Sequence, residues 1–471
     1  MLGKIKFWSV VLAVAAMTCS SMPPVLAQDT GDNSREDSEF DTSLDTELDS
    51  EEEASPEGIL PLRDYSGDLW SRSYLLGDVG GARSDLAAKG IQFGLDWTQT
   101  VQGVVDGGHN ETTRYGGSLD YTLTLDLHRM DLIPGAVLSV RAESRYGNSV
   151  NGAAGPLLPV NVDAFFPLTT HLDEDIEVTV TALNYMQFLT PQFGFILGKI
   201  DTLDGDQNEF ASGRGVSQFM NSPFVFNPVG GLTIPYSTLA AGVVWIPNPH
   251  VHVTSAIMNA ADSSTTTGFS DFGDGWNWST EVQFQYRLGD LPGGQTIGVM
   301  YATDREFITL GPRFVSGQDV RLTPNTEDDS WFVTWNGWQY LWTEEEPSDA
   351  HIDVMNGVPD LQGMGVFARA GIADEDTNPT DWTISAGMGG RGIIPGRDHD
   401  VFGVGYFYTH VQADKLLGGR LFEDHSHGLE AFYNLAITPA AALTFDVQIS
   451  EDPFPATDTS VLFGARLHMR F

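Results

Sequence analysis

Val461-Leu462-Phe463-Gly464-Ala465-Arg466-Leu467-His468-Met469-Arg470-Phe471 is the stretch that decides the fold. Every second side chain from Val461 to Phe471 is apolar, and from Gly464 onward the positions between hold glycine, arginine or histidine. Since successive side chains of a strand point to opposite faces, one face of this strand is apolar and the other basic. That pattern is typical of a strand with lipid on one side and water on the other. Phe471 is then expected at the membrane rim, where aromatic rings gather.

Other stretches repeat this alternation of apolar and polar side chains. A helix would scatter both sets around its axis, so the pattern predicts strands. The clearest cases are Leu119 to His128, Ala136 to Arg145, Leu443 to Ser450, and a hairpin that runs from Glu281 to Leu288, turns at Asp290 to Gly294 and resumes at Ile297.

Residues 1–27 have the features of a secretory signal peptide. Lys4 and Lys6 precede the apolar run from Phe7 to Met17, and Val25-Leu26-Ala27 is a small-residue cleavage site. A retained hydrophobic anchor is the alternative. The run is too short to span a membrane as a helix, and no later stretch has about 18 uninterrupted apolar residues, which argues against a helical-bundle membrane protein. The single cysteine, Cys19, lies inside the signal, so no disulfide is expected.

Residues 28–62 are predicted to be an acidic leader without stable structure. Asp29 to Glu57 holds thirteen acidic residues against the single basic Arg35. A segment with so little to bury and so much charge repulsion stays disordered, so we expect it to be solvated in the periplasm. A specific docking role is the alternative. The whole chain has a formal charge of −40 and no basic patch, which argues against nucleic-acid binding.

Residues 63–90 are predicted to form an ordered periplasmic segment. Asp78 is a candidate N-cap for a short helix that runs through Lys89, and Gly90 is its expected stop. Period-two sequence begins directly afterwards, so residues 91–471 are assigned to the β-domain.

Alternation alone does not separate a membrane barrel from a soluble secreted β-protein. The secretion signal, strands of about ten residues, short turns such as Pro247-Asn248-Pro249 and the terminal aromatic together favour the barrel. A sheet in lipid has to close, because an open edge leaves backbone groups unpaired. About 380 residues in hairpins of about 45 to 50 residues give about 16 strands. The predicted fold is therefore all-β, a transmembrane antiparallel β-barrel around an aqueous channel.

A series of short motifs is spread along the chain. The first is Leu76-Gly77-Asp78-Val79-Gly80-Gly81-Ala82-Arg83, and the others are Tyr115-Gly116-Gly117, Leu197-Gly198-Lys199-Ile200-Asp201, Gly365-Val366-Phe367-Ala368-Arg369, Gly396-Arg397-Asp398 with Asp400, and Glu430-Ala431-Phe432-Tyr433. In their order they resemble the OprB-type carbohydrate-selective porins of bacterial outer membranes, although Val79 stands where that family usually has tryptophan. The resemblance extends from Trp70 to Phe471. It implies the same strand number, an outer-membrane location in contact with lipid, and small sugars as transported solutes; the residues themselves indicate only a polar pore.

Arg141, Glu143 and Arg145 are the first candidates for a pore constriction. They alternate with apolar Val140 and Ala142, and a charge on the lipid face at mid-membrane would cost about 2–4 kcal/mol, so we expect all three to line water. Such a row offers both donors and acceptors to sugar hydroxyls. The alternative is an electrostatic ladder that only stiffens the wall. Lys199 and Arg369 are the next candidates.

Four of the eleven tryptophans lie between Trp331 and Trp342. Amphipathic rings settle at the membrane interface, so an aromatic girdle is the favoured interpretation, with stacking on sugar rings as the alternative. Period two places Trp331 and Trp335 on one face and Trp338 and Trp342 on the other. Trp338 is therefore also a candidate for the lumen.

Enzymatic and metal chemistry are not expected. The chain has no Gly-x-Ser-x-Gly, His-Glu-x-x-His or Walker motif, and no outward-facing Ser–His pair that a lipase barrel would need. Metal ligands occur in Glu423-Asp424-His425-Ser426-His427 and in the set Asp201, Asp204, Asp206 and Glu209, but a solvated acidic loop is the expectation for each, so neither a metal nor a cofactor is predicted. General or cation-preferring diffusion, a structural envelope barrel and a homotrimer stay open as alternatives.

Overall fold

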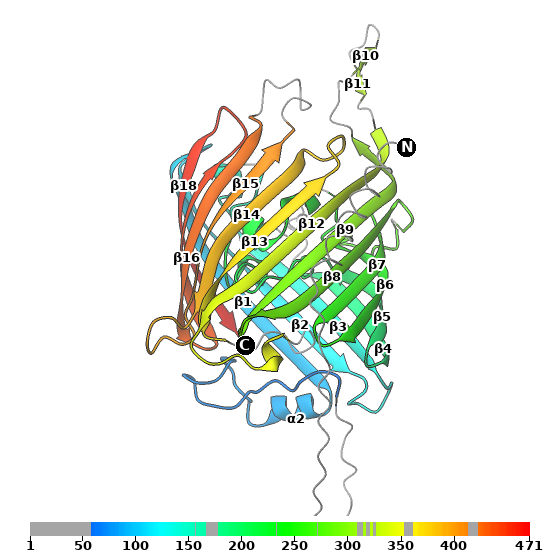
Figure 1. Cartoon of the computed structure of the whole chain (residues 1–471), viewed down its shortest axis with the longest axis vertical. Helices are drawn as coiled ribbons and strands as arrows, with labels where there is room; N and C mark the ends of the chain where they lie inside the picture. The colour runs from blue at the N-terminus through cyan, green and yellow to red at the C-terminus, as the bar shows by residue number, and fades with distance from the viewer. Residues whose placement is uncertain are drawn as a thin grey trace, which may run out of the picture. The chain divides into compact units, whose positions relative to one another are not determined.

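A closed antiparallel barrel is the main feature of the computed structural model (Figure 1). The structure describes residues 58–155, 157–165, 178–231, 233–270, 272–308, 314–316, 321–323, 326–352, 361–412 and 423–471, so the predicted signal peptide and most of the acidic leader lie outside it. Within these residues, sixteen strands form the ring, and the first pairs with the last. The predicted β-barrel of about 16 strands is confirmed.

The barrel strands are β1 Ile91–Gly108, β2 Thr112–Asp126, β3 Ala136–Gly147, β4 Thr179–Thr190, β5 Phe193–Asp201, β6 Ser237–Asn248, β7 Val251–Asn259, β8 Trp276–Leu288, β9 Leu291–Ile308, β12 Thr326–Thr343, β13 Gly363–Ala373, β14 Thr380–Arg391, β15 Val401–Val411, β16 His425–Thr438, β17 Ala441–Glu451 and β18 Asp458–Arg470. Two short strands, β10 Phe314–Ser316 and β11 Arg321–Thr323, pair only with each other. The described helices are α2 Ala82–Ala88, α3 Asn151–Ala154, α4 Ser222–Val225, η2 Gly213–Gly215, η3 Pro228–Gly230 and η4 Asp349–Ile352. None of them has the length and apolar character needed to cross a membrane.

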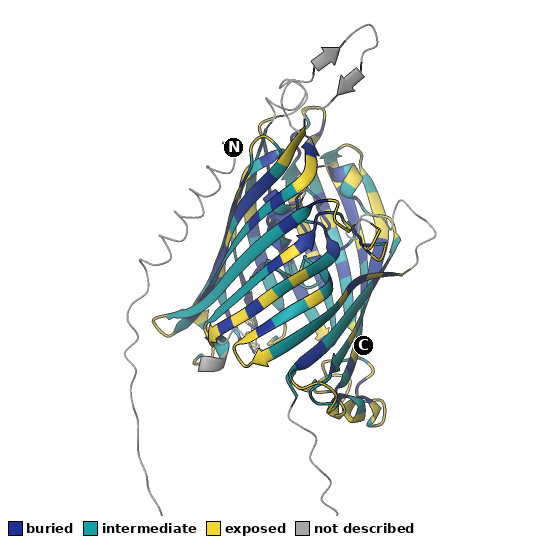
Figure 2. Ribbon diagram, turned by 90° about the vertical axis from the view of Figure 1, so that its right-hand side faces the viewer, coloured by how far each residue is buried: buried dark blue, intermediate teal, exposed yellow. Residues whose placement is uncertain are grey.

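The two faces of the strands differ in exposure as the alternation predicts (Figure 2). On β17, Phe445 is 52% exposed on the outer face, whereas Asp446 is 2% exposed on the inner face. On β18, Phe463 is 53% exposed and Arg466 is fully buried. Apolar side chains on the outside and polar ones on the inside are what a barrel in lipid requires.

The N-terminal segment is held against one end of the barrel by Arg83. Its guanidinium lies 4.2 Å from the ring centroid of Tyr65 and donates hydrogen bonds to the carbonyls of Phe93 and Phe471. Helix α2 begins at Ala82, three residues later than an N-cap at Asp78 predicts. Asp78 lies outside the helix and accepts a hydrogen bond from the Ser84 N–H. Gly90, with φ +85°, follows the helix as expected.

Ordered contacts begin earlier than residue 63. The Leu60 N–H donates to Asp126 and the Gln92 side chain donates to the Pro61 carbonyl. Residues 58–62, which the composition assigned to the disordered leader, therefore contact the barrel.

The hairpin between β8 and β9 turns at two residues, Gly289 and Asp290. The predicted strand start at Ile297 was wrong, because Pro292, Gly293 and Gly294 already pair with β8. Pairing with both neighbouring strands outweighs the local preference of these residues for turns.

The tryptophan-rich strand β12 carries a bulge that changes one prediction. Trp338 points inward and Trp335 is 38% exposed on the outside, as period two predicts. Leu341 is skipped in the pairing with β13, so Trp342 lies opposite Met364 and is 46% exposed. Its assignment to the face of Trp338 was wrong, since a bulge inserts one residue and reverses the faces beyond it.

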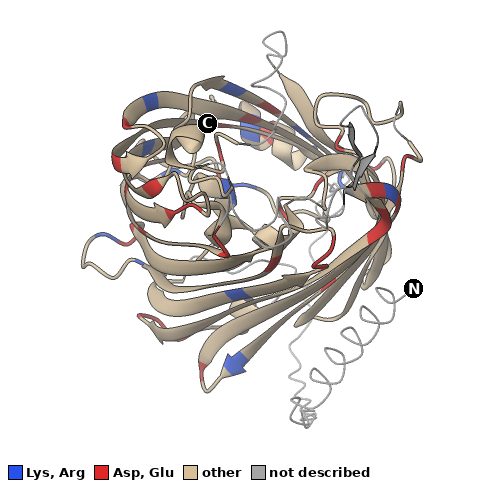
Figure 3. Ribbon diagram, turned by 90° about the horizontal axis from the view of Figure 1, so that it is seen from above, with Lys and Arg blue, Asp and Glu red and all other residues tan. Residues whose placement is uncertain are grey.

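The longer connections between barrel strands are mostly at the end of the barrel opposite to α2 and Phe471 (Figure 1). This end corresponds to the cell exterior, because outer-membrane barrels have long extracellular loops and short periplasmic turns. Two of these connections, 148–178 and 202–236, contribute residues that fold back against the inner wall; a view along the barrel shows loops inside the ring (Figure 3).

We expect deletion of Phe471 to impair barrel assembly. Its N–H donates to the Leu95 carbonyl, and its own carbonyl accepts from Arg83, so the deletion weakens the seam between β1 and β18. The folded fraction, read from heat-modifiable gel mobility, should fall several-fold, whereas Phe471→Tyr should assemble normally. Normal assembly of the deletion variant would contradict the proposed role of the aromatic end.

Candidate functional site

The segment Thr202–Tyr236 fills one side of the lumen. Its Phe210, Phe219 and Phe224 pack against aromatic side chains of the barrel wall; these are Trp338 and Tyr340 of β12, Phe367 of β13, Phe407 of β15 and Phe432 of β16. The ring centroids of Phe219 and Phe224 are 4.6 Å apart, and those of Phe219 and Phe432 are 4.8 Å apart. The wall from the Trp338 and Tyr340 part of β12 to β16 is therefore covered by a packed core.

Charged side chains of the wall bind the backbone of this segment. Arg369 donates to the carbonyls of Phe224, Asp206 and Ala211 and forms an ion pair of 3.0 Å with the Asp206 carboxylate. On the same wall, the Glu430 carboxylate accepts from the backbone N–H groups of Met220 and Asn221 at 2.6 and 2.9 Å.

Arg466 of β18 adds a further attachment. It is fully buried and donates to the carbonyls of Gly215 and Gln218. Buried charges are tolerated when they are paired and hydrogen-bonded, so each attachment both satisfies a wall charge and fixes the segment.

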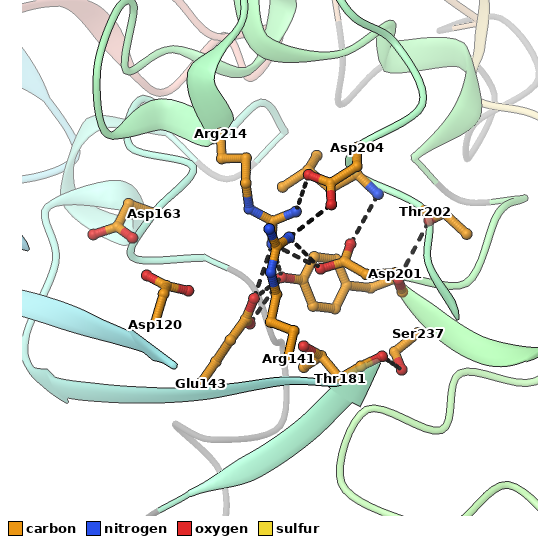
Figure 4. A network of polar contacts seen from close by, with 12 residues as sticks. Asp120, Arg141, Glu143, Asp163, Thr181, Asp201, Thr202, Asp204, Arg214 and Ser237 are labelled. Carbon is orange, nitrogen blue, oxygen red and sulfur yellow. Dashed lines mark hydrogen bonds and ion pairs between the residues drawn. The ribbon is translucent and has the colours of Figure 1, made fainter. Parts of the chain in front are cut away.

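A network of ion pairs lies where β3 faces this segment (Figure 4). Arg141 Nη1 lies 2.7 Å from Asp204 and 3.3 Å from Asp201. Arg214, from the segment, lies 2.7 Å from Asp204, 2.8 Å from Asp201 and 2.9 Å from Glu143. Burial raises the pKa of the Asp204 carboxyl, but the guanidiniums of Arg214 and Arg141 outweigh burial and lower it overall. Asp204 is thus ionised at neutral pH, and its side chain is 46% exposed.

Arg145 extends this network further along β3. It lies 3.6 Å from Glu143, 3.7 Å from Asp120 and 3.8 Å from Asp163, and its Nε donates to the Asp163 carbonyl. Its side chain is 6% exposed, against 23% for Arg141. Water and solute therefore reach Arg141 and Asp204 more readily than Arg145.

A cavity of about 350 Å³ lies beside the network, on the side of the lumen that the segment leaves open. One side is lined by the segment, including Asp204 and Tyr236, and the other by β7, β8, β9 and β12. The facing wall offers hydroxyl, imidazole, amide and carboxyl groups from His252, Thr254, Ser279, Glu281 and Gln283. Donors and acceptors thus face each other across a water-accessible space.

The sequence-predicted candidates separate into three groups. Arg141, Glu143 and Arg145 lie together on the inner face of β3. Arg369 and Trp338 also point inward, but they are 1% and 9% exposed and hold the segment rather than facing open water. Lys199 lies elsewhere: its ammonium donates to the carbonyls of Val180, Ser264 and Thr266, and it pairs across the sheet with outward-facing Leu183.

Arg214 and Tyr236 belong to the network but were not predicted. Tyr236 Oη donates to Glu143 at 2.8 Å and accepts from Arg214. Neither residue lies in a period-two stretch, so alternation gave no signal for them. Arg214 has φ +55° between two glycines, and the sequence Gly213-Arg214-Gly215 is the one local sign of an unusual backbone there.

Comparison with known proteins decides the family. The family model described as "Carbohydrate-selective porin, OprB family" matches residues 110–471. The chain belongs to the OprB family of carbohydrate-selective porins. Porin B of Pseudomonas aeruginosa is 23% identical to this OprB-family chain over 438 residues, which cover 84% of the chain and 91% of Porin B.

Solved structures support the fold of this OprB-family porin. The high-pH structure of Pseudomonas putida OprB superimposes with a TM-score of 0.69 at 19% identity, covering 86% of this chain and 100% of that one. The low-pH structure of the same protein gives a TM-score of 0.52 at 16% identity, covering 85% and 99%. The chain is thus an outer-membrane porin for sugars, and its family and fold point to transport rather than catalysis.

Proposed function

We propose that sugars cross this porin passively through the space between the Thr202–Tyr236 segment and strands β7 to β9, and that the Arg141–Arg214 network is its constriction. The observation that carries this proposal is the cavity, because the opposite side of the lumen is a packed aromatic core. We propose no catalytic step.

The lining of this space suits a neutral polyhydroxyl solute. Each sugar hydroxyl is both a donor and an acceptor, so it needs partners of both kinds to replace its water. Carboxylates such as Glu281 accept, guanidiniums such as Arg141 donate, and Thr254 does both. Selectivity between solutes then depends on how well the hydrogen bonds to these groups replace the hydrogen bonds that each solute loses to water.

Cation preference is a second candidate property. The network places Asp120, Glu143, Asp163, Asp201 and Asp204 against the guanidiniums of Arg141, Arg145 and Arg214, and carboxylates exceed guanidiniums. An acidic ring at a constriction attracts cations. We therefore propose that the ions carried alongside sugars are mainly cations.

We also propose that assembly as a homotrimer is compatible with this path, because the path lies within a single barrel.

Planar-bilayer conductance of the refolded protein, titrated with mono- and oligosaccharides, tests the sugar path. We expect saturable block of the ion current in the wild type. Glu281→Gln replaces a luminal carboxyl group that can bind a sugar hydroxyl by an amide, so the half-blocking sugar concentration should rise about tenfold, the equivalent of one lost hydrogen bond.

Glu345→Gln, which removes an exposed charge from the connection between β12 and β13, is the matched control and should leave the block unchanged. Absence of sugar block in the wild type would contradict sugar passage, and an unchanged block in Glu281→Gln would contradict the path along β8.

A further inference from the structure

A cluster of His425, His427 and Glu451 lies at the extracellular end of β16 and β17, apart from the lumen. His427 and Glu451 are directly opposite each other in the sheet, and His425 is two residues away on the same face. The next pair on this face, Leu429 and Ile449, is 38% and 45% exposed, so the cluster lies on the outer face just beyond the apolar band.

The distances within the cluster suit one metal ion. One ligand atom from each residue can be chosen so that all three lie within 4.8 Å of one another. His427 Nδ1 is 3.6 Å and His425 Nε2 is 3.8 Å from the Glu451 carboxylate. A tetrahedral zinc site with bonds of about 2.1 Å separates its ligand atoms by about 3.4 Å, which is close to both histidine-to-carboxylate distances.

His427 Nδ1 gives a second, independent observation. This nitrogen is buried, yet it has no hydrogen-bond partner among the described residues. Buried polar atoms in proteins nearly always have a partner, so a nitrogen that faces a carboxylate without a hydrogen bond is available to ligate a metal ion. All three side chains are about one-third exposed, so an ion from solution can reach them.

The surroundings of His425 hold it in a ligating orientation. Its Nδ1 lies 2.9 Å from the Asp424 carboxylate, which leaves Nε2 directed at Glu451. Its ring also stacks on Tyr408, with centroids 5.6 Å apart and planes 3° from parallel. A carboxylate that binds the second nitrogen of a histidine is the usual support of a zinc ligand.

We propose that His425, His427 and Glu451 bind one divalent cation of the zinc class on the outer rim of the barrel, with Asp424 as the orienting residue. Two imidazoles and one carboxylate favour zinc or a similar transition ion over calcium or magnesium, which prefer oxygen ligands. The bound ion would link β16 to β17 where the two strands separate into loops.

Zinc titration of the detergent-purified full-length protein, freed of metal by a chelator, tests this site. We expect one saturable zinc ion per chain in isothermal titration calorimetry. His427→Gln and His425→Ala should each weaken the affinity at least tenfold, and Asp424→Asn should weaken it about tenfold through loss of orientation. Bound zinc should also raise the temperature at which the barrel unfolds in detergent, because it binds only the folded state.

Heat-modifiable mobility shows whether each variant is folded, so weak binding is not confused with misfolding. His399→Ala, in the periplasmic turn after β14, controls for nonspecific histidine binding and should keep wild-type affinity. Absence of saturable binding, wild-type affinity in folded His427→Gln, or an equal loss in His399→Ala would overturn the proposal. Sugar block is measured in parallel and is expected to be independent of zinc.

Discussion

Replacement of both Arg141 and Arg214 by alanine should make the channel strongly cation-selective. The double variant leaves Asp201 and Asp204 without the guanidiniums that now lie 2.7 to 3.3 Å away, and leaves Glu143 with Arg145 as an ion-pair partner and the Tyr236 hydroxyl as a donor. One unit charge at about 4 Å contributes about 1 kcal/mol even in water and more in a less polar lumen. The cation-to-anion permeability ratio should therefore rise about tenfold or more.

The reversal potential across a salt gradient measures this ratio directly. Sugar block should weaken in the same variant, because donors to sugar hydroxyls are lost while acceptors remain. Lys89→Ala removes an exposed positive charge just after α2, outside the barrel, and should change neither quantity. An unchanged reversal potential in the double variant would place the constriction elsewhere in the lumen.

Arg369→Ala should release the Thr202–Tyr236 segment and widen the channel. The substitution leaves the Asp206 carboxylate and three carbonyls without their shared donor, whose side chain is 1% exposed. Breaking a buried ion pair from one side costs about 3–5 kcal/mol. We expect a several-fold larger and noisier single-channel conductance, together with new protease cleavage inside the segment, while the barrel itself stays closed.

Arg83→Ala is the matched control for this experiment. Arg83 is as deeply buried as Arg369, at 2% exposure, but it holds the N-terminal segment instead of the luminal one. Its loss should lower thermal stability without changing conductance. Wild-type conductance and no new cleavage in Arg369→Ala would show that the aromatic contacts alone hold the segment in place.

The barrel wall was predictable because the signal for it is local. Each strand places apolar and polar side chains on opposite faces within about ten residues, so a short window of sequence holds the information. The row on β3 was found in this way. The face of Trp342 was not, since a bulge depends on the pairing with β13 and leaves no mark in the alternation of β12 itself.

The luminal segment was not predictable, because its contacts join distant parts of the chain. Arg214 and Glu143 are 71 positions apart, and Arg369 and Ala211 are 158 apart. The surroundings of Lys199 were not predictable for the same reason. A lysine in a strand was expected to face water in the lumen, but three backbone carbonyls, two of them from the connection between β7 and β8, provide it with partners on the other face.

The aromatic core inside the wall from β12 to β16 has a consequence for how such channels are compared. The number of strands sets the circumference of the barrel wall. The width of the open channel is what remains of the lumen beside the Thr202–Tyr236 segment and its aromatic core. A pore diameter calculated from the conductance of this protein should therefore match a much slimmer cylinder than a sixteen-stranded barrel suggests. Homologues with the same number of strands but a smaller aromatic core in the lumen should have a larger conductance. The size of the barrel and the width of its channel can therefore change independently during evolution.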